Sequence, residues 1–531
     1  MNVASSPGRR TLADLARVFS LHTDTDTDTD SDTDTDIAER LDVRVAGVSL
    51  DNRLTEPGDL FAALPGGRTH GARFAAAAAQ AGAVAILTDA AGASVLADQE
   101  VQVPVLVAPD PRAVLGQVAS WVHERPSEHL RTFAVTGTNG KTTTTYFLEH
   151  ILAAAGRTTG LIGTVELKIA GQRTPARLTT PEAPAVHGLL ATMVRAGVGD
   201  VVMEVSSHAL GLHRVDGVTY TVAGFTNLTS DHLDFHGDLE SYFAAKASLF
   251  TPARAQRGVV LVDDRWGRRL AEQAEIDVVT LSATGADADW QVRAGDPGPA
   301  GTAVTLHGPG GARLRTSVHL PGAFNIANAG LALVMALQSG LTVEQIEDAL
   351  PSGLDTVVPG RMELLATAPR VLVDFAHNTE ALEQALAAVA EGASGRIFVV
   401  FGATGDRDRS KRGPMGRAAV AGADVVVVTD DDPHDEDPAT IRSEVMAGAL
   451  AERDQQQRAG RKVQVHEVAP RQAAIARAVR IAGAADTVLI AGRGHETWQE
   501  IAGVDHYLDD RQEVRGAMAQ RAQHPRPLTD S

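Results

Sequence analysis

The chain has 531 residues, 44% of them hydrophobic and 22% charged, with no cysteine and a formal net charge of -19. This length exceeds one ordinary hydrophobic core and predicts three domains, while the absence of cysteine excludes disulfides, thiolate nucleophiles and thiolate metal ligands. The acidic balance argues against a nucleic-acid partner, because phosphate backbones need clustered Lys and Arg.

The N-terminal region has neither a membrane span nor a secretory signal in its pattern. No apolar stretch approaches the ~18 residues that span a membrane, and the segment after Arg9 and Arg10 has no continuous apolar core. We therefore expect a cytoplasmic protein without membrane insertion, and we expect a monomer. Residues 23–36 alternate Asp with Thr or Ser and contribute seven carboxylates. Such a segment buries nothing and is predicted to be a disordered insertion; a weak cation-binding role is the alternative.

Short apolar runs bounded by Gly, Pro and Asp follow this insertion and are typical of strands in a small mixed domain. They lie at residues 43–50, 60–64, 83–87 and 101–107. A polar stretch around residues 124–129 then precedes the apolar run 132–135, which we interpret as the first strand of a second domain.

In the final third of the chain, apolar runs alternate with helical patterns, which predicts a parallel sheet with right-handed crossovers. The expected strands are residues 371–375, 397–401, 425–429, 463–466 and 488–491, and the expected helices are residues 380–390, 439–452 and 471–482. Ligands of such sheets bind beyond the carboxyl ends of the strands. Polar residues that follow these runs are therefore predicted to share one site: Arg407, Asp432, His434 and Glu496.

The most specific motif is a glycine-rich loop between the run 132–135 and an amphipathic helix. It consists of Thr136, Gly137, Thr138, Asn139, Gly140, Lys141, Thr142 and Thr143. Glycines let backbone N–H groups approach phosphate oxygens, Lys141 can bridge terminal phosphates, and the Thr142 hydroxyl can bind Mg²⁺. Val135 replaces the usual leading glycine, so the loop is a variant P-loop. The alternative, a helix cap that only looks like a P-loop, does not account for Gly-Lys-Thr in this context.

Two further clusters follow apolar runs. Glu204, in residues 203–208, could hold magnesium, although a carboxylate at the end of a strand has no metal-binding role at least as often. Residues 226–237 place two His and two Asp within six positions, which is unusual for a core loop. Lys246 then falls among alanines and aromatics on an expected helix, where a lysine is by itself most simply a snorkelling side chain.

Together these motifs resemble the Mur ligase family, and within it the third ligase of the series, the MurE type. The resemblance covers nearly the whole chain and continues through residues 320–328, 360–363, 374–378 and 492–496. It implies an α/β fold of three domains: residues 1–128, a small mixed domain that binds the UDP-muramoyl substrate; residues 129–358, a central P-loop ATPase-like domain with a parallel sheet; and residues 359–531, a Rossmann-like domain that binds an amino acid.

The resemblance also assigns roles residue by residue. It implies that Lys141 and the rest of the loop bind ATP, that Thr142, Glu204 and His232 bind Mg²⁺, and that Lys246 is carbamylated. Further nucleotide contacts are expected from Asn325, Arg361 and Asp374. The UDP-N-acetylmuramoyl dipeptide is expected to meet Ser49, Asn52, Arg53, Thr179, Thr180, Ser206 and Arg214. The incoming diamino acid is expected to meet Arg407, Asp432, His434, Gly492 and Glu496.

The identity of the amino acid depends on residues 431–434, Asp-Asp-Pro-His. Family members that use meso-diaminopimelate have Asp-Asn-Pro-Arg, whose arginine binds the distal carboxylate. Here the guanidinium is absent and a carboxylate is added, which favours a cationic distal group and therefore L-lysine. Meso-diaminopimelate, with an arginine supplied from elsewhere, and L-ornithine remain alternatives.

Two other functions compete with this one. Another ligase of the superfamily, such as folylpolyglutamate synthase or the fourth Mur ligase, shares the central motifs, but residues 47–53 and 57–61 resemble a UDP-muramoyl-binding domain. A nonhydrolytic nucleotide-binding scaffold on the same fold is the other competitor, since fold alone does not fix function. The presence of Lys141, Glu204, His232 and Lys246 argues against a scaffold.

Overall fold

The computed structural model describes residues 10–23, 41–67, 69–99, 101–298 and 301–523. The predicted disordered insertion, residues 23–36, lies outside this range except for Thr23. The chain forms two compact units. The first unit comprises Met1–Ala134, Arg157–Ala223 and Ala245–Arg257, and the second comprises Val135–Gly156, Gly224–Ala244 and Gly258–Ser531.

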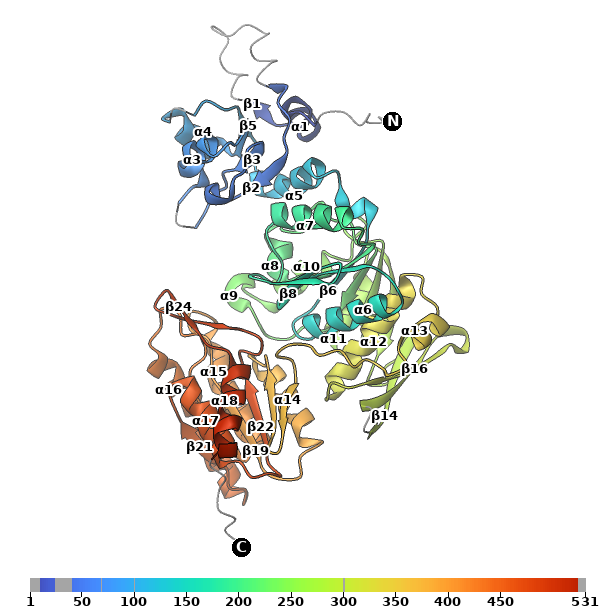
Figure 1. The fold of residues 1–531 in the computed structure, drawn as a ribbon, viewed down its shortest axis with the longest axis vertical. Coiled ribbons are helices and arrows are strands. Elements are labelled where there is room, and N and C mark those ends of the chain that lie inside the picture. Colours follow the sequence, from blue (N-terminus) through green and yellow to red (C-terminus); the bar gives the residue numbers. More distant parts are fainter. Residues whose placement is uncertain (1–9, 24–40, 68, 100, 299–300, 524–531) are drawn as a thin grey trace. The chain divides into compact units, whose positions relative to one another are not determined.

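The first unit begins with a five-stranded mixed sheet in the order β1-β5-β4-β3-β2 (Figure 1). Its strands are β1 (His22–Thr23), β2 (Gly47–Ser49), β3 (Asp59–Ala62), β4 (Ala85–Thr88) and β5 (Val105–Val107), and its helices are α1 (Leu12–Phe19), α3 (Ala75–Gln80), α4 (Ala90–Ala97) and α5 (Pro111–Val122). Strands β2 to β5 pair in parallel, whereas β1 pairs with β5 antiparallel. Leu60 and Leu87 pack into one core and Phe61 and Ile86 into another, so both faces of the sheet are buried.

An eleven-stranded sheet follows, with the order β16-β15-β14-β13-β12-β11-β6-β10-β7-β8-β9. Its strands are β6 (Arg131–Thr136), β7 (Thr159–Ile162), β8 (Glu166–Ile169), β9 (Gln172–Pro175), β10 (Asp200–Glu204), β11 (Val222–Phe225), β12 (Arg257–Leu261), β13 (Asp277–Ser282), β14 (Trp290–Gly298), β15 (Gly301–His307) and β16 (Arg313–Val318). Parallel pairs such as β10–β7 and β13–β14 match the predicted parallel sheet. The antiparallel ladders β7-β8-β9 and β14-β15-β16 were not predicted.

The helices of this region include the one that follows the glycine-rich loop. They are α6 (Lys141–Ala154), α7 (Ala183–Arg195), α8 (Ser207–Gly211), α9 (Leu233–His236), α10 (Leu239–Ala247), α11 (Arg265–Gln273), α12 (Ala323–Gln338) and α13 (Val343–Ala349). Within the second unit, α6 and α12 pack against each other. This contact brings the start of α12 beside the loop that precedes α6.

The C-terminal part of the second unit is a six-stranded sheet in the order β17-β18-β22-β19-β20-β21. Its strands are β17 (Glu363–Thr367), β18 (Arg370–Asp374), β19 (Ile397–Phe401), β20 (Val425–Val428), β21 (Gln464–Glu467) and β22 (Thr487–Ala491); its helices are α14 (Thr379–Ala390), α15 (Arg412–Gly422), α16 (Pro438–Arg458), α17 (Arg471–Ile481) and α18 (Asp510–Gln523). The parallel pairing of β18, β22, β19, β20 and β21 confirms the predicted alternation of strands and helices.

Both faces of this C-terminal sheet are covered. Phe398 and Val400 pack into one core with Ile475 of α17, while Val399 and Phe401 pack into the other with Met415 of α15. Burial on both faces explains why its strands are continuous apolar runs. A separate hairpin, β23 (Trp498–Ile501) and β24 (Val504–Tyr507), follows β22 and was not predicted. Within the described ranges, no helix is long and apolar enough to cross a membrane.

Candidate functional site

The glycine-rich loop of the second unit has the close packing that its sequence predicts. Gly137 and Gly140 have φ of 151° and 88°. A Cβ atom on Gly137 would lie 1.8 Å from Thr226 Oγ1, and one on Gly140 would lie 2.3 Å from Asn328 Oδ1. Helix α6 begins at Lys141, directly after this turn. The loop therefore needs glycine at both positions, and it ends at a helix N-terminus suited to an anion.

The Lys141 ammonium group folds back over this loop. Its Nζ atom donates to the carbonyl oxygens of Gly137 and Thr138 at 3.0 and 2.9 Å. Thr142 is buried, and its Oγ1 atom accepts a hydrogen bond from Arg361 Nη2 at 3.4 Å. The loop thus presents a lysine and a threonine hydroxyl together, the pair expected for phosphate and magnesium binding.

The segment after β11 holds Asn139 of the loop in place. Asn227 Oδ1 accepts from the Asn139 N–H at 3.0 Å, and Thr226 Oγ1 donates to the Asn139 carbonyl at 2.7 Å. The Asn378 amide also donates to Asn139 Oδ1 at 3.1 Å. Asn378 lies in the motif at residues 374–378, but it was not predicted as a site residue. These contacts give the second predicted cluster, residues 226–237, a structural role beside the loop.

Asp231 and His377 lie close together next to this segment. His377 Nε2 lies 3.6 Å from Asp231 Oδ2, and the ring of the predicted ligand His232 lies 3.9 Å from the same oxygen. Burial acts to raise the pKa of Asp231, but the hydrogen bond from His377 and the charges of His377, His232 and Lys411 outweigh it and hold that pKa well below its usual range. Asp231 is therefore ionised at neutral pH and can attract a cation.

A cavity of about 370 Å³ adjoins the loop within the second unit. Its lining residues come from the loop, from the segments after β11 and β12, and from α12 and α14: Asn139, Gly140, Thr226, Asn227, Leu261, Asp263, Asp264, Ala283, Thr284, Ala323, Phe324, Ala327, Asn328, Glu380, Gln384, Ala387, Ala388 and Glu391. Its size and its mixture of apolar and polar walls fit a flat heterocyclic ring. The cavity is therefore a candidate site for a nucleotide base.

Asn325 and Asn328 lie on the first turns of α12. Asn325 Nδ2 donates to the Pro321 carbonyl at 2.7 Å, and Asn328 Nδ2 donates to Asn325 Oδ1 at 3.3 Å. Asn328 lines the cavity, whereas the predicted residue Asn325 supports Asn328 from behind. Helical spacing of three residues was the signal that could have identified Asn328.

Arg361 connects the loop to the C-terminal sheet. Its guanidinium lies 4.2 Å from the centre of the Phe375 ring and 3.4 Å from His495 Nδ1, in addition to its contact with Thr142. Asp374 accepts hydrogen bonds from the N–H groups of Met362 and Ala376 at 2.7 and 2.9 Å, and burial raises its pKa. Asp374 thus holds the turn that carries Arg361.

The first unit brings together several predicted residues around Glu204 at the end of β10. Its carboxylate accepts from the Thr164 N–H at 2.7 Å and from the Thr164 hydroxyl at 2.9 Å. Thr180 Oγ1 donates to the Glu204 carbonyl at 2.8 Å and accepts from the Ser206 N–H at 3.1 Å. Thr179 Oγ1 lies 3.0 Å from the Thr164 hydroxyl oxygen. Thr164 was missed because no motif marks it.

Arg214 joins this group from the turn that follows α8. Its Nη1 atom donates to the Thr180 carbonyl at 3.3 Å, and its Nε atom lies 2.8 Å from Glu182 Oε1. Arg112 of α5 contacts the same Glu182 carboxylate at 3.4 Å. Two guanidinium groups therefore flank one carboxylate, an arrangement suited to an anionic substrate group.

Lys246 of α10 is 1% exposed. A snorkelling lysine would keep its ammonium group in water, so burial contradicts that alternative for Lys246.

The predicted substrate-binding residues near the N-terminus form a local turn. Ser49 ends β2 and its hydroxyl lies 2.9 Å from that of Thr55, while Arg53, beside Asn52, pairs with Asp51 at 2.5 Å.

The predicted metal ligands have suitable chemistry. Glu204 and Thr142 each offer oxygen, the ligand atom that Mg²⁺ prefers, and His232 offers an imidazole nitrogen. Among the described residues, Asp431, Asp432 and Glu496 also have carboxylate oxygens within 4.8 Å of one another. A buried arginine lies among these three carboxylates, so they have a cationic partner from the protein itself.

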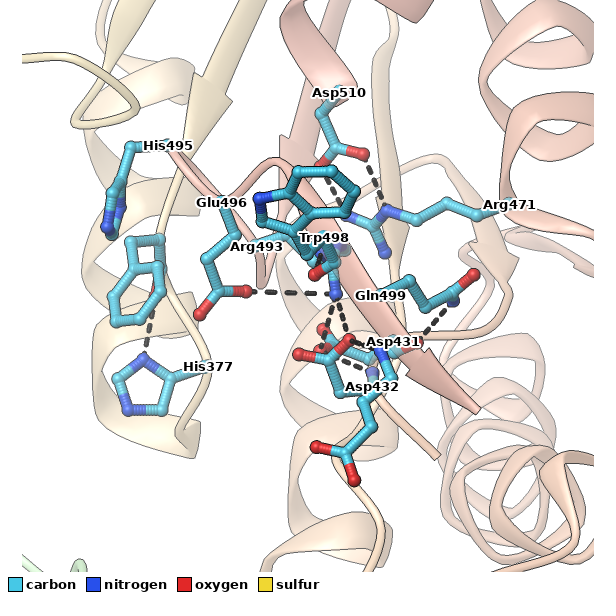
Figure 2. Close-up of polar contacts among 12 residues, drawn as sticks. His377, Asp431, Asp432, Arg471, Arg493, His495, Glu496, Trp498, Gln499 and Asp510 are labelled. Carbon is cyan, nitrogen blue, oxygen red and sulfur yellow. Dashed lines mark hydrogen bonds and ion pairs between the residues drawn. The ribbon is translucent and has the colours of Figure 1, made fainter. Parts of the chain in front are cut away.

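That arginine, Arg493, is the centre of a cluster at the carboxyl ends of β20 and β22 (Figure 2). It hydrogen bonds to Asp432 and lies 3.7 Å from Glu496 and 4.0 Å from Asp431. Gly492, with φ of 114°, lets the chain pass Asp431, since a Cβ there would lie 2.4 Å from Asp431 Oδ2. The cluster has more carboxylates than guanidinium groups.

The charge imbalance shifts the ionisation of the cluster. Burial, followed by the nearby Asp432 and Asp431, raises the pKa of Glu496 to about 8 against the opposing effect of Arg493. Burial and Asp431 also raise the pKa of Asp432. A cationic ligand that enters the cluster would restore the charge of Glu496.

The structure brings together two of the four residues that were predicted to share one site. Asp432 and Glu496 meet through Arg493, whereas Arg407 lies exposed in the loop after β19. His434, with φ of 51°, pairs with Glu500 at 3.0 Å. Neither Arg493 nor Glu500 was predicted as a site residue. Arg493 lay inside a quoted motif, but nothing in the local sequence marks Glu500.

Comparisons with known proteins match this arrangement. Residues 135–336 match the Mur ligase middle domain, residues 360–494 match the Mur ligase glutamate ligase domain, and residues 44–122 match the Mur ligase family catalytic domain. The three matches cover the glycine-rich loop, the Ser49 turn, and Asp431, Asp432 and Arg493 of the acidic cluster.

Curated relatives are similar over most of their length. A UDP-N-acetylmuramyl-tripeptide synthetase from Leifsonia xyli is 45% identical over 90% of this chain and 92% of its own. A UDP-N-acetylmuramoyl-L-alanyl-D-glutamate–2,6-diaminopimelate ligase from Streptomyces avermitilis is 46% identical over 90% of this chain and 93% of its own. A solved structure of a ligase with that second name has a TM-score of 0.61 and 32% identity, covering 91% of this chain and 96% of its own.

Proposed function

The chain belongs to the Mur ligase family, whose members are ATP-dependent ligases of peptidoglycan synthesis, and on this premise we propose that it adds L-lysine to UDP-N-acetylmuramoyl-L-alanyl-D-glutamate. The amide bond would form at the D-glutamate carboxyl group. The observation that supports this most is the acidic cluster, in which three carboxylates lie within 4.0 Å of the Arg493 guanidinium group, because it suits a distal ammonium group and disfavours a distal carboxylate.

One loop serves both parts of the proposed site. Arg493 and Glu496 belong to the acidic cluster. His495 lies between them in the sequence and contacts Arg361, which donates to Thr142 of the P-loop. The phosphates of ATP and the incoming amino acid would therefore be positioned by the same short segment. This proximity is what a ligase needs to join an activated acid to an amine.

Activation is required because a free carboxylate does not accept an amine when hydroxide has to leave. The D-glutamate carboxylate would attack the γ-phosphate of ATP and release ADP, which gives an acyl phosphate. Lys141 and the loop N–H groups would stabilise negative charge on the transferred group. The neutral amine would then attack the acyl carbon, and phosphate would leave.

Mg²⁺ bound by Thr142, Glu204, His232 and a carbamylated Lys246 would supply charge neutralisation for the phosphates. Glu204 has the hydrogen-bonded, buried setting of a preorganised ligand, because Thr164 holds both of its oxygens. In the same scheme, Arg361 orients the phosphate side of ATP, Asn325 supports Asn328 beside the base, and Asp374 holds the turn of Arg361.

The remaining predicted residues would bind the UDP-sugar peptide. We place the uridine nucleotide at the turn of Ser49, Asn52 and Arg53. The rest of that substrate would contact the group of Thr179, Thr180, Ser206 and Arg214, where guanidinium and hydroxyl donors gather. The test is replacement of Arg214 by Ala, which should raise the KM for the UDP-sugar peptide without changing the KM for ATP.

The choice of L-lysine over meso-diaminopimelate rests on charge. Meso-diaminopimelate has a distal carboxylate, which would approach Asp432 and Glu496 without an arginine at position 434. L-ornithine has the same distal charge as L-lysine and is the close competitor. Relatives named as diaminopimelate ligases at 45–46% identity make meso-diaminopimelate the second candidate.

The decisive experiment compares kcat/KM for L-lysine, L-ornithine and meso-diaminopimelate, with phosphate release measured in the presence of the UDP-sugar dipeptide. We expect L-lysine to be used most efficiently. Equal or greater efficiency with meso-diaminopimelate would overturn the choice of amino acid. Phosphate release that needs a folate substrate would support the folylpolyglutamate alternative, and no release with any amino acid would support a scaffold.

A further inference from the structure

Glu500 lies on β23, outside every motif of the sequence, yet the backbone fixes it beside residues 431–434. The His434 N–H donates to the Glu500 carbonyl at 3.1 Å, and the Ala502 N–H donates to the His434 carbonyl at 2.7 Å. These bonds form a parallel bridge between His434 and Ile501. The hairpin is thereby attached to the segment that follows β20.

The side chain of Glu500 is oriented by the same neighbours. The carboxylate Oε2 atom of Glu500 lies 3.0 Å from His434 Nδ1. The backbone N–H of Glu500 donates to Asp432 Oδ1 at 3.2 Å. The Glu500 side chain is 43% exposed, whereas that of His434 is 20% exposed. The carboxylate is therefore held by His434 and accessible to solvent, while the backbone N–H of the same residue contacts the acidic cluster at Asp432.

Glu500 adds a further negative charge to an already acidic place. Arg493 is surrounded by Asp431, Asp432 and Glu496, and its fixed charge balances one of them. A carboxylate accepts about four hydrogen bonds, so the contact with His434 leaves capacity for another donor. An ammonium group satisfies this demand, and a carboxylate group would be repelled.

We propose that Glu500 is a specificity-determining residue of this enzyme, whose carboxylate, oriented by His434, accepts the distal ammonium group of the incoming diamino acid. The inference rests on the proposed function. His434 acts as a positioning residue, because its imidazole contacts Glu500 Oε2 and leaves the other oxygen to accept the ligand. Meso-diaminopimelate has the same distal ammonium group, so selection against it comes from repulsion of its additional distal carboxylate.

The test measures kcat/KM for L-lysine and for meso-diaminopimelate in the wild type and in Glu500→Gln. A hydrogen bond to a charged group is lost, so kcat/KM for L-lysine should fall by roughly tenfold to a hundredfold, mainly through KM. The KM for ATP should stay unchanged, and so should the selectivity ratio of the control Glu452→Gln, which removes a carboxylate from α16. The ratio of L-lysine to meso-diaminopimelate should fall most in Glu500→Gln and less in Glu500→Asp, which keeps the charge.

The possible results separate the two proposals. A wild type that uses no diamino acid overturns the proposed function, and with it the role of Glu500. If the wild type prefers L-lysine and the selectivity ratio of Glu500→Gln is within twofold of the wild-type ratio, only the role of Glu500 is overturned. If Glu500→Gln does not fold, Glu500→Asp decides: an unchanged ratio and an unchanged KM for L-lysine contradict the proposal, whereas an increased KM supports it.

Discussion

The guanidinium of Arg471 and the carboxylate of Asp510 form an ion pair in which neither side chain is exposed, with 2.7 Å between Nη2 and Oδ2. Arg471 also donates to the carbonyl oxygens of Asp430 and Ala491, at 3.0 and 2.9 Å. Ala491 is the last residue of β22, and Asp430 lies shortly after β20. The pair therefore ties the starts of α17 and α18 to the two strand ends that display the acidic cluster.

This geometry predicts a large stability loss in Arg471→Met. Burial acts to lower the pKa of Arg471, but the Asp510 carboxylate raises it above the ordinary value, so the guanidinium stays charged. Removing one partner leaves the other buried and unpaired, which costs about 3–5 kcal/mol. Urea unfolding should show this loss, whereas Arg453→Ala, which breaks an exposed pair with Asp454, should leave the midpoint nearly unchanged. Equal midpoints in the two variants would contradict the prediction.

A second prediction separates backbone strain from close packing in the P-loop. Gly140 and Gly156 have similar φ angles of 88° and 80°. A Cβ atom added to Gly140 would lie 2.3 Å from Asn328 Oδ1, whereas a Cβ atom added to Gly156 would have no neighbouring atom within 4 Å. Each alanine substitution should lower the free energy of unfolding by about 1–2 kcal/mol, because alanine is strained at a positive φ. Gly140→Ala should in addition raise the KM for ATP, because Asn328 has to move and Asn328 lines the cavity.

Gly156→Ala is the matched control for this effect. It should lower the melting temperature while the KM for ATP stays at the wild-type value. If Gly140→Ala binds ATP as tightly as Gly156→Ala does, the contact between Gly140 and Asn328 has no role in nucleotide binding.

The parts of this fold that could be predicted are those in which local sequence and burial agree. Val425–Val428 is buried on both faces, so an unbroken apolar run identified the strand. The hairpin β23–β24 gave no such pattern, because Trp498 and Tyr507 are exposed while Gln499 is buried against the Asp431 carbonyl. A two-stranded ribbon follows the surface to which it is attached, and its own sequence does not describe that surface.

The candidate site shows the same division. The P-loop was predictable because its glycines, Lys141 and Thr142 are consecutive in the chain. Thr164 at Glu204 and Glu500 at His434 were not, because each contact joins residues far apart in sequence through the pairing of strands or a bridge. Local motifs give the groups that perform chemistry, while the residues that orient them depend on tertiary structure.

A third prediction concerns pH and the acidic cluster. Because the pKa of Glu496 is raised to about 8, this carboxyl is neutral at pH 7 and binds a cation weakly. We expect kcat/KM for the diamino acid to rise more steeply in the wild type than in Glu496→Gln between about pH 6 and about pH 9. The substrate amine also deprotonates over this interval, but it does so equally for both proteins. Parallel pH profiles would show that Glu496 does not titrate there.

The same shift predicts the direction of a stability change. Between its ordinary pKa of 4.5 and about 8, Glu496 is ionised in the unfolded chain but protonated in the folded chain. The folded state binds the extra proton, so this group lowers the free energy of unfolding as pH rises through that window. The stability of Glu496→Gln relative to the wild type should therefore increase from pH 5 to about pH 8. A constant difference would exclude the shift.

The last prediction tests whether Lys246 is carbamylated. A lysine that is 1% exposed on α10 is costly to bury as an ammonium group, and a carbamate would turn it into an oxygen ligand for Mg²⁺. Addition of ¹³C-bicarbonate should give a carbamate NMR signal in the wild type that is absent from Lys246→Ala. The variant should lose activity and regain part of it with added short carboxylates, which supply the missing oxygens. Lys168→Ala, which removes a lysine from β8, should keep the carbamate signal. Wild-type turnover in Lys246→Ala without added carboxylate would remove Lys246 from the mechanism.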